Sequence, residues 1–187
     1  MSGLQGPASA RYPMAPLIRF TLISLYLALV APLPLLAEGE LQIALWLALP
    51  LGLLLVVAAT SEQVELCDTS IRVGHPAWCS WLLRRGWSLP WNEIRGLTPV
   101  ATSQGGRVFY VRAADGSAYL LPQRVAAFET FLSQFGQETG LDVSNIGRIS
   151  PPWTYQLLAG LSGAMLLAEL AWGVWGLVTG ISVGLRN

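Results

Sequence analysis

The sequence offers few side chains that could carry out chemistry. Its one histidine and two cysteines are Cys67, His75 and Cys79, whose spacing differs from the four-ligand, paired-cysteine pattern of structural zinc sites. Nor does closeness in the sequence place a general base beside a thiol nucleophile. We therefore expect two reduced thiols and a loop histidine here, and we predict no catalytic residues, no metal and no cofactor for this chain.

Glu169 is the one ionisable residue well inside a long apolar stretch, 153–185. A carboxylate at membrane depth is costly unless it is protonated or paired, so such a residue is by default a candidate functional site. One hypothesis is a proton relay, or pairing with an arginine of a partner. In the alternative, Glu169 lies near the far membrane interface, where Trp172 and Trp175 belong to an aromatic belt.

A cluster of tryptophan and arginine is the next candidate site. Trp78, Trp81, Arg84 and Arg85 lie close together in the sequence. Tryptophan favours the membrane–water interface, and arginine can hold a lipid phosphate through two hydrogen bonds. These residues are therefore candidate contacts to lipid headgroups or to a partner, whereas in the alternative the arginines form a solvated turn.

Small residues recur every four positions along the last apolar stretch. Such stripes let membrane helices approach closely, where dispersion and Cα–H contacts hold them together. The stripe therefore predicts a helix surface that meets protein, either another membrane protein, a second copy of the chain, or the chain's own helical hairpin. The candidate helix-docking residues are Gly160, Ala164, Ala168, Glu169, Gly176, Gly180 and Gly184.

The composition indicates a membrane protein. Of the 187 residues, 53% are hydrophobic and only 12% are charged, against about 25% charged in an ordinary soluble domain. Eleven basic residues balance eleven acidic ones, so the chain lacks the positive footprint of a nucleic-acid-binding protein. Two cysteines also exclude a disulfide scaffold.

Three apolar stretches are long enough to cross a hydrocarbon core of roughly 30 Å as helices. Phe20–Ala37 and Leu41–Thr60 are predicted to form a hairpin around the polar residues 38–40. The third stretch, Trp153–Leu185, is longer than the core requires, so it must tilt, protrude or split. This leaves open whether residues 176–187 span the membrane or lie on its surface.

The placement of arginine predicts the orientation of these spans. Arg11 and Arg19 precede the first span, whereas the 38–40 loop holds two acids and no base. By the positive-inside rule, the N-terminus and the middle region face the cytoplasm, or the stroma in a photosynthetic cell, although Arg186 on the far side opposes this weakly. The first span could also be read as a signal peptide that is removed. We expect it to be retained, because Leu35 is an unsuitable residue three positions before a signal-peptide cleavage site.

Residues 61–150 have a different pattern, with alternating apolar residues between turn signals. The turn signals include Asp68-Thr69-Ser70 and Asp115-Gly116, and together they predict six or seven short antiparallel strands. Trp87 and Trp91 share one face of an extended run and are expected in the core. Pro90 between them lacks an N–H donor, which indicates an edge strand or a bulge.

An amphipathic helix is predicted to close this β domain. Its apolar stripe, at i, i+3, i+4 and i+7, consists of Phe128, Phe131, Leu132 and Phe135. The predicted organisation is therefore a disordered tail (1–15), a transmembrane hairpin (16–60), a cytoplasmic β domain with a C-terminal helix (61–150) and a third transmembrane segment (151–187).

Two segments of the β domain carry a resemblance to known proteins. These are Trp87-Ser-Leu-Pro-Trp91-Asn-Glu-Ile94 and Asp115-Gly-Ser-Ala-Tyr-Leu-Leu-Pro122, and they resemble bacterial membrane proteins with a pleckstrin-homology-like (PH-like) domain. The resemblance covers residues 61–140 and implies a PH-like β-barrel capped by one helix. The whole chain is also similar to small uncharacterised membrane proteins of cyanobacteria, and this similarity implies the photosynthetic (thylakoid) membrane as one location for it. Neither family supplies catalytic residues.

Three functions are compatible with these observations. The first is a non-enzymatic interaction module, an accessory subunit or assembly factor that docks to another integral-membrane protein, to lipids, or to its own copy in a homo-oligomer. The second is a lipid-binding or membrane-state sensor, which predicts salt-sensitive binding of the β domain to anionic liposomes. The third is transport or a proton relay through Glu169.

Overall fold

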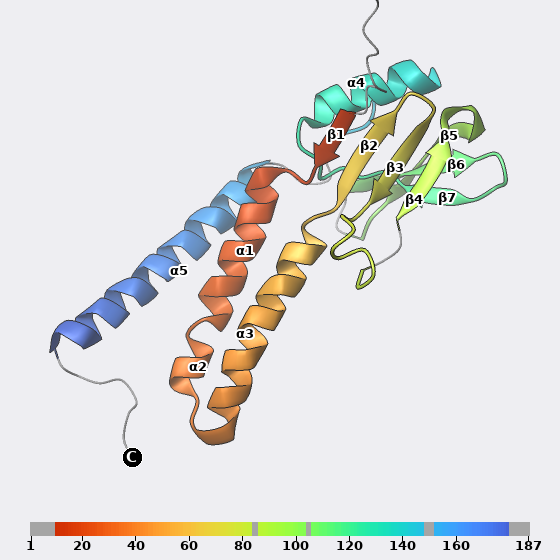
Figure 1. The fold of residues 1–187 in the computed structure, drawn as a ribbon. Helices are drawn as coiled ribbons and strands as arrows, with labels where there is room; N and C mark the ends of the chain where they lie inside the picture. Colours follow the sequence, from red (N-terminus) through yellow and green to blue (C-terminus); the bar gives the residue numbers. More distant parts are fainter. Residues whose placement is uncertain (1–9, 84–85, 104–105, 148–151, 180–187) are drawn as a thin grey trace, which may run out of the picture. The chain divides into compact units, whose positions relative to one another are not determined.

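The computed structural model describes residues 10–83, 86–103, 106–147 and 152–179 (Figure 1). The chain divides into two compact units. The strand-rich unit consists of Met1–Ala15 and Ser61–Pro151, and the helical unit consists of Pro16–Thr60 and Pro152–Asn187.

Three candidate membrane spans make up the described part of the helical unit: Pro16–Leu36, Gly39–Ala59 and Trp153–Gly176. Each is long and apolar enough to cross a membrane by length and composition, so the three predicted apolar stretches are confirmed as helical. The underlying helices are α1 (Pro16–Val30), α2 (Leu33–Leu36), α3 (Gly39–Ala59) and α5 (Pro152–Thr179).

The first span was predicted as one helix, but it is broken at residues 31–32, between α1 and α2. Pro32 disfavours helical backbone at Ala31, and neither Pro32 nor Pro34 has an N–H to continue the helix. The side chain of Gln42 in α3 donates a hydrogen bond to the carbonyl of Pro34 at 3.1 Å. This bond fixes α2 against α3, the helix that follows it.

Polar contacts set the direction in which the helices pack. The Tyr26 hydroxyl of α1 donates to the Leu49 carbonyl of α3 at 2.8 Å, as expected for antiparallel neighbours. The hydroxyls of Ser24 and Ser162 lie 2.9 Å apart and join α1 to α5, while Thr21 donates to the Tyr155 carbonyl at 3.3 Å. Since the residue numbers rise together, α1 and α5 run parallel.

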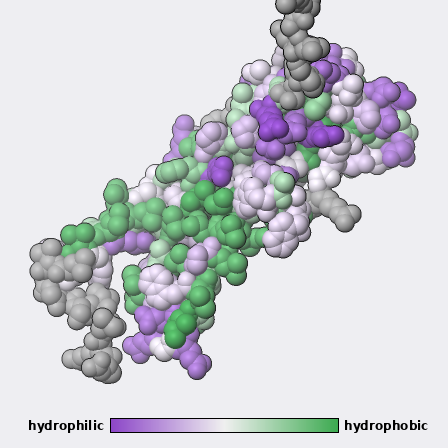
Figure 2. Space-filling view, in the orientation of Figure 1, coloured by the Kyte–Doolittle hydropathy of each residue, from purple (hydrophilic) through white to green (hydrophobic). Residues whose placement is uncertain are grey.

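Large apolar side chains cover the outside of the helical unit. Figure 2 shows green, hydrophobic colour over these helices and purple, hydrophilic colour over much of the strand-rich unit. An exposed apolar surface of this extent is typical of helices that face lipid. The most exposed of these side chains include Phe20, Leu36, Leu47, Leu51, Leu167 and Leu170.

Seven strands form two antiparallel sheets in the described part of the strand-rich unit, in the orders β1-β2-β3-β4 and β5-β6-β7. Six of the described strands, β2 to β7, lie within residues 61–150, where six or seven were predicted, and the Pro90-containing strand β4 lies at a sheet edge as expected. The strands are β1 (Ala10–Pro13), β2 (Gln63–Cys67), β3 (Ser70–Gly74), β4 (Trp87–Pro90), β5 (Ile94–Ala101), β6 (Arg107–Ala113) and β7 (Ala118–Leu120).

The prediction of a closed barrel is wrong, because the described strands leave two separate sheets. Pro90 has no N–H with which to extend the ladder. The 3-10 helix Trp91–Glu93 then leads the chain from β4 into β5 of the other sheet. The two sheets are therefore joined through packed side chains instead of a continuous hydrogen-bond ladder.

Strand β1 corrects the prediction of a disordered tail for residues 10–13, whereas residues 1–9 lie outside the described residues. Tyr12 is buried and its ring meets Phe131 edge-on, with centroids 5.5 Å apart. Arg11 forms an ion pair with Glu65 of β2 at 3.0 Å. This strand belongs to the same sheet as residues more than fifty positions away, so a local composition argument could not detect it.

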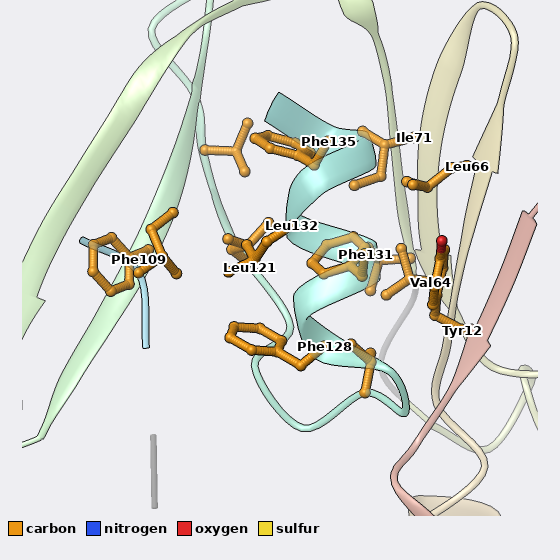
Figure 3. Close-up of a cluster of buried hydrophobic side chains, with 14 of the residues drawn as sticks. Tyr12, Val64, Leu66, Ile71, Phe109, Leu121, Phe128, Phe131, Leu132 and Phe135 are labelled. Carbon is orange, nitrogen blue, oxygen red and sulfur yellow. The ribbon is translucent and has the colours of Figure 1, made fainter. Parts of the chain in front are cut away.

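The predicted closing helix is confirmed as α4 (Phe128–Thr139), and its apolar face fills the core. Figure 3 shows its three phenylalanines between side chains of the two sheets, with Val64 on one side and Phe109 on the other. The four residues of the predicted stripe are all buried. Gly140 ends the helix in the left-handed conformation, with φ 68°, which glycine adopts without steric cost.

Candidate functional site

Two surfaces carry the candidate site residues, one in each unit. The first is the tryptophan loop, residues 75–83, which follows β3 in the connection to β4. Its backbone folds into successive turns, in which Cys79 and Ser80 donate to the Pro76 carbonyl at 3.1 and 3.0 Å. Trp81 donates its ring N–H to the Trp78 carbonyl at 3.0 Å. These bonds give the loop a defined shape.

The tryptophan loop points its apolar side chains outward. Trp81 is 79% exposed and Trp78 is 49% exposed, whereas Cys79 between them is buried. Leu82 is also half exposed. Arg84 and Arg85, the other two residues of the predicted cluster, lie outside the described residues.

Trp87 and Trp91 take the other role that we predicted, because both pack against the hydrophobic core. The Trp87 ring stacks on Tyr119 of β7, with centroids 5.1 Å apart. Trp91 donates its ring N–H to the Cys67 carbonyl at 2.8 Å. The four clustered tryptophans therefore divide into an outward-facing pair, 78 and 81, and a core pair, 87 and 91.

The predicted thiols and histidine occupy different surroundings. Cys67 is half-buried and Cys79 is buried, and both are free thiols. The His75 Nδ1 atom is buried without a hydrogen-bond partner among the described residues. Within the same described part of the chain, no three histidine, cysteine or acidic side chains gather as metal ligands would.

The second surface is the outer face of α5, which consists of Gly160, Ala164 and Ala168. All three residues are exposed, and a methyl group added at Gly160 would meet nothing within 4 Å. At about 100° per residue, Gly160 and Ala164 project about 160° away from Ser162, the residue that packs on α1. The chain's own hairpin therefore contacts a different face of α5.

The remaining residues of the stripe continue toward the end of α5. Gly176 is half-buried and lies near the end of the described helix, while Gly180 and Gly184 lie outside the described residues. The sequence left open whether residues 176–187 span the membrane or lie on its surface; of these, 176–179 continue α5, and 180–187 lie outside the described residues. The outer face of α5 is therefore defined by its first three members.

Glu169 lies on the same side of α5 as Ser162, because seven residues amount to a net rotation of only about 20°. Its side chain is half-buried. It precedes the exposed Trp172 by three residues, a rise of about 4–5 Å along the helix. The carboxylate thus lies close to the aromatic end of α5.

Two carboxylates have shifted pKa values, and both belong to surface turns instead of the candidate surfaces. The Ser117 hydroxyl and N–H bind Asp115 and lower its pKa. Ser144 does the same for Asp142 through its side chain and backbone. Hydrogen bonds that favour the ionised form explain both directions, so these two groups stabilise turns.

The hydroxyl contacts between α1 and α5 were not predicted from the sequence. Thr21, Ser24 and Ser162 are all buried, and each is a small polar residue within an apolar stretch. Such residues commonly form hydrogen bonds between membrane helices. Their presence in two separate spans was the available signal for this pair of helices.

Comparison with known proteins finds a relative of this chain in a cyanobacterium. No protein-family model matches it, and the comparisons give no support to the resemblance to PH-like domains. The uncharacterised protein slr0269 of Synechocystis sp. is 40% identical to the chain over 168 residues, which cover 87% of this chain and 81% of that protein. This agrees with the similarity to small uncharacterised cyanobacterial proteins. The chain belongs to the same family as this Synechocystis protein.

Proposed function

We propose that this protein is an integral-membrane interaction module, whose three helices cross the membrane and whose α5 docks to another membrane protein. In this role it is a non-enzymatic accessory subunit or assembly factor of a larger complex. The relative in Synechocystis supports a cyanobacterial membrane, and the thylakoid is the membrane we propose first. Arg11 and Arg19 support a cytoplasmic, or stromal, strand-rich unit.

The spacing of tryptophans on α5 supports a spanning role. Trp153 is exposed near the start of the helix, and Trp172 and Trp175 are exposed near its end. The rise from Trp153 to Trp172 is about 29 Å, close to the thickness of a hydrocarbon core. Aromatic belts at both interfaces have this separation.

The observation that carries the docking proposal is the open outer face of α5. The hairpin contact uses the serine side of the helix, so the small residues stay available for close approach by a second helix. Gly160 has free space around it, which a partner's side chains can fill. In a bilayer, such close packing and not the hydrophobic effect drives helices together.

The double variant Gly160→Leu/Ala164→Leu should block docking without disturbing the fold, because both positions are exposed. Purification of the tagged chain from its native membrane in mild detergent should recover a stoichiometric membrane partner with the wild type. With the variant, we expect at least a tenfold loss of that partner, about 1.4 kcal/mol of docking free energy.

The matched control is Gly173→Leu. Gly173 is also exposed on α5, with nothing within 4 Å of an added methyl, but it projects about 180° away from Ala164. This variant should recover the partner normally. Equal recovery with all three chains, or recovery of the wild type without any partner, would contradict docking through this face.

A second candidate function, transport or a proton relay, depends on Glu169. The half-buried carboxylate on the α1 side of α5 favours it, whereas the short distance to Trp172 along the helix favours an interfacial position. We propose the interfacial position. Glu169→Gln should therefore leave both complex assembly and growth of the host under light unchanged. If the variant assembles normally but growth fails, the relay replaces our proposal.

A further inference from the structure

The strand register places the tryptophan loop at one particular end of the four-stranded sheet. Gln63, the first residue of β2, pairs with Gly74, the last residue of β3. Gln63 also pairs with Pro13, the last residue of β1. The tryptophan loop therefore leaves the sheet at the end where β1 finishes and β2 begins.

That same end of the sheet is tied to two apolar helices by short pieces of chain. Only residues 14 and 15 separate β1 from α1, and only residues 60–62 separate α3 from β2. A fully extended chain spans at most about 3.6 Å per residue, so the Cα atoms of Ala59 and Gln63 lie no more than about 14 Å apart. This limit follows from chain length alone, whatever the orientation of the two units.

The tryptophan loop has the chemistry of an interfacial contact. Trp78, Trp81 and Leu82 project from a turn whose buried member is Cys79. An indole has a large apolar body and one N–H donor, which suits the boundary between headgroups and acyl chains. The ring N–H of Trp81 already donates a hydrogen bond to the Trp78 carbonyl. The ring can therefore enter an apolar layer without leaving a hydrogen-bond donor unsatisfied.

We propose that the tryptophan loop inserts Trp78, Trp81 and Leu82 into the interfacial layer of the membrane that α1 and α3 cross. The occupant of this surface is lipid, because two tethers hold the loop's end of the sheet within a few residues of both helices. The chain itself links the two units at three points, before α1, after α3 and before α5. The loop then acts as a further attachment that limits rotation of the strand-rich unit about these links. This inference assumes one part of the proposed function, that α1 and α3 cross the membrane. It does not depend on the docking of α5 to a partner.

The test uses the full chain in vesicles of phosphatidylcholine and phosphatidylglycerol. A photoreactive benzoylphenylalanine replaces Trp78, Trp81 or Asp68, one position in each of three samples. Asp68 is an exposed residue in the β2–β3 turn, at the opposite end of the same sheet. After illumination, mass spectrometry measures the lipid attached at each position. We expect several times more lipid adduct at position 81 than at position 68, and a similar excess at position 78.

Extraction of the same vesicles with alkaline carbonate separates the two proposals. A chain that resists extraction, with no excess of lipid adduct at positions 78 and 81, would overturn the loop insertion and leave the membrane spans standing. A chain released by carbonate would overturn both. In native membranes, adducts between position 81 and a protein in place of lipid would likewise overturn the choice of lipid as occupant.

Discussion

Phe131→Ala should destabilise the strand-rich unit by about 3–5 kcal/mol, the usual cost of truncating a fully buried phenylalanine. Phe131 is 0% exposed and lies between Phe128 and Phe135 on the same face of α4. It also contacts Tyr12 of β1 edge-on. Domains of this size are stable by about 5–15 kcal/mol, so this loss removes a large part of the total.

Cys79 offers a direct readout of this loss. It is buried in the folded chain, so its reaction with a thiol reagent during a urea titration reports unfolding of the strand-rich unit. The midpoint of labelling should fall markedly for Phe131→Ala in the detergent-solubilised full chain. Leu120→Ala is the control, because Leu120 is 48% exposed and its truncation should cost under about 1 kcal/mol. If the two variants shift the midpoint equally, α4 does not carry the core.

The elements of this fold were largely predictable where the pattern is local. Apolar stretches of about twenty residues predicted the three spans, and the helical spacing of Phe128 to Phe135 predicted α4. Asp115-Gly116 predicted the β6–β7 turn, in which Gly116 has φ 86°. Each signal lies within a single short window of the sequence.

What the sequence did not predict depends on partners distant along the chain. Residues 10–13 form a strand only because β2 supplies hydrogen bonds across an inserted helical hairpin. A closed barrel and two sheets have the same strands in the same order and differ only in which edges pair. Pro90 was the local clue that pairing stops at β4, but one proline does not reveal where the chain goes next.

The sequence identified the candidate site residues, but it did not show which side of a helix or domain each of them occupies. The recurrence of Gly160, Ala164 and Ala168 indicated a contact surface, yet it fitted packing on the chain's own hairpin equally well. The contact between Ser24 and Ser162 distinguishes these two interpretations, because it fixes the side of α5 that meets α1. For the tryptophans, the division came from exposure and packing: Trp78 and Trp81 are exposed, whereas Trp87 and Trp91 pack on a core built from residues distant in the sequence.

A close backbone approach beside the four-stranded sheet predicts a second large effect, at Gly86. This residue precedes β4, and a methyl group added to it would clash with the Val73 carbonyl oxygen and lie 2.8 Å from the Gly74 Cα. Both atoms belong to the backbone of β3, so no side chain can rotate away. Gly86→Ala must therefore displace the start of β4, where Val73 pairs with Trp87.

We expect Gly86→Ala to cost about 1–3 kcal/mol or more, as for other overpacked sites. The displacement also disturbs the stacking of Trp87 on Tyr119, a contact between the two sheets. Hydrogen exchange should show faster exchange at the Val73 and Trp87 amides, together with a lower urea midpoint for Cys79 labelling. Gly96→Ala is the matched control, because an added methyl there meets nothing within 4 Å, and it should change neither measurement. Normal exchange in Gly86→Ala would show that β4 is not held against β3 at this distance, and the register that positions the tryptophan loop would lose its support.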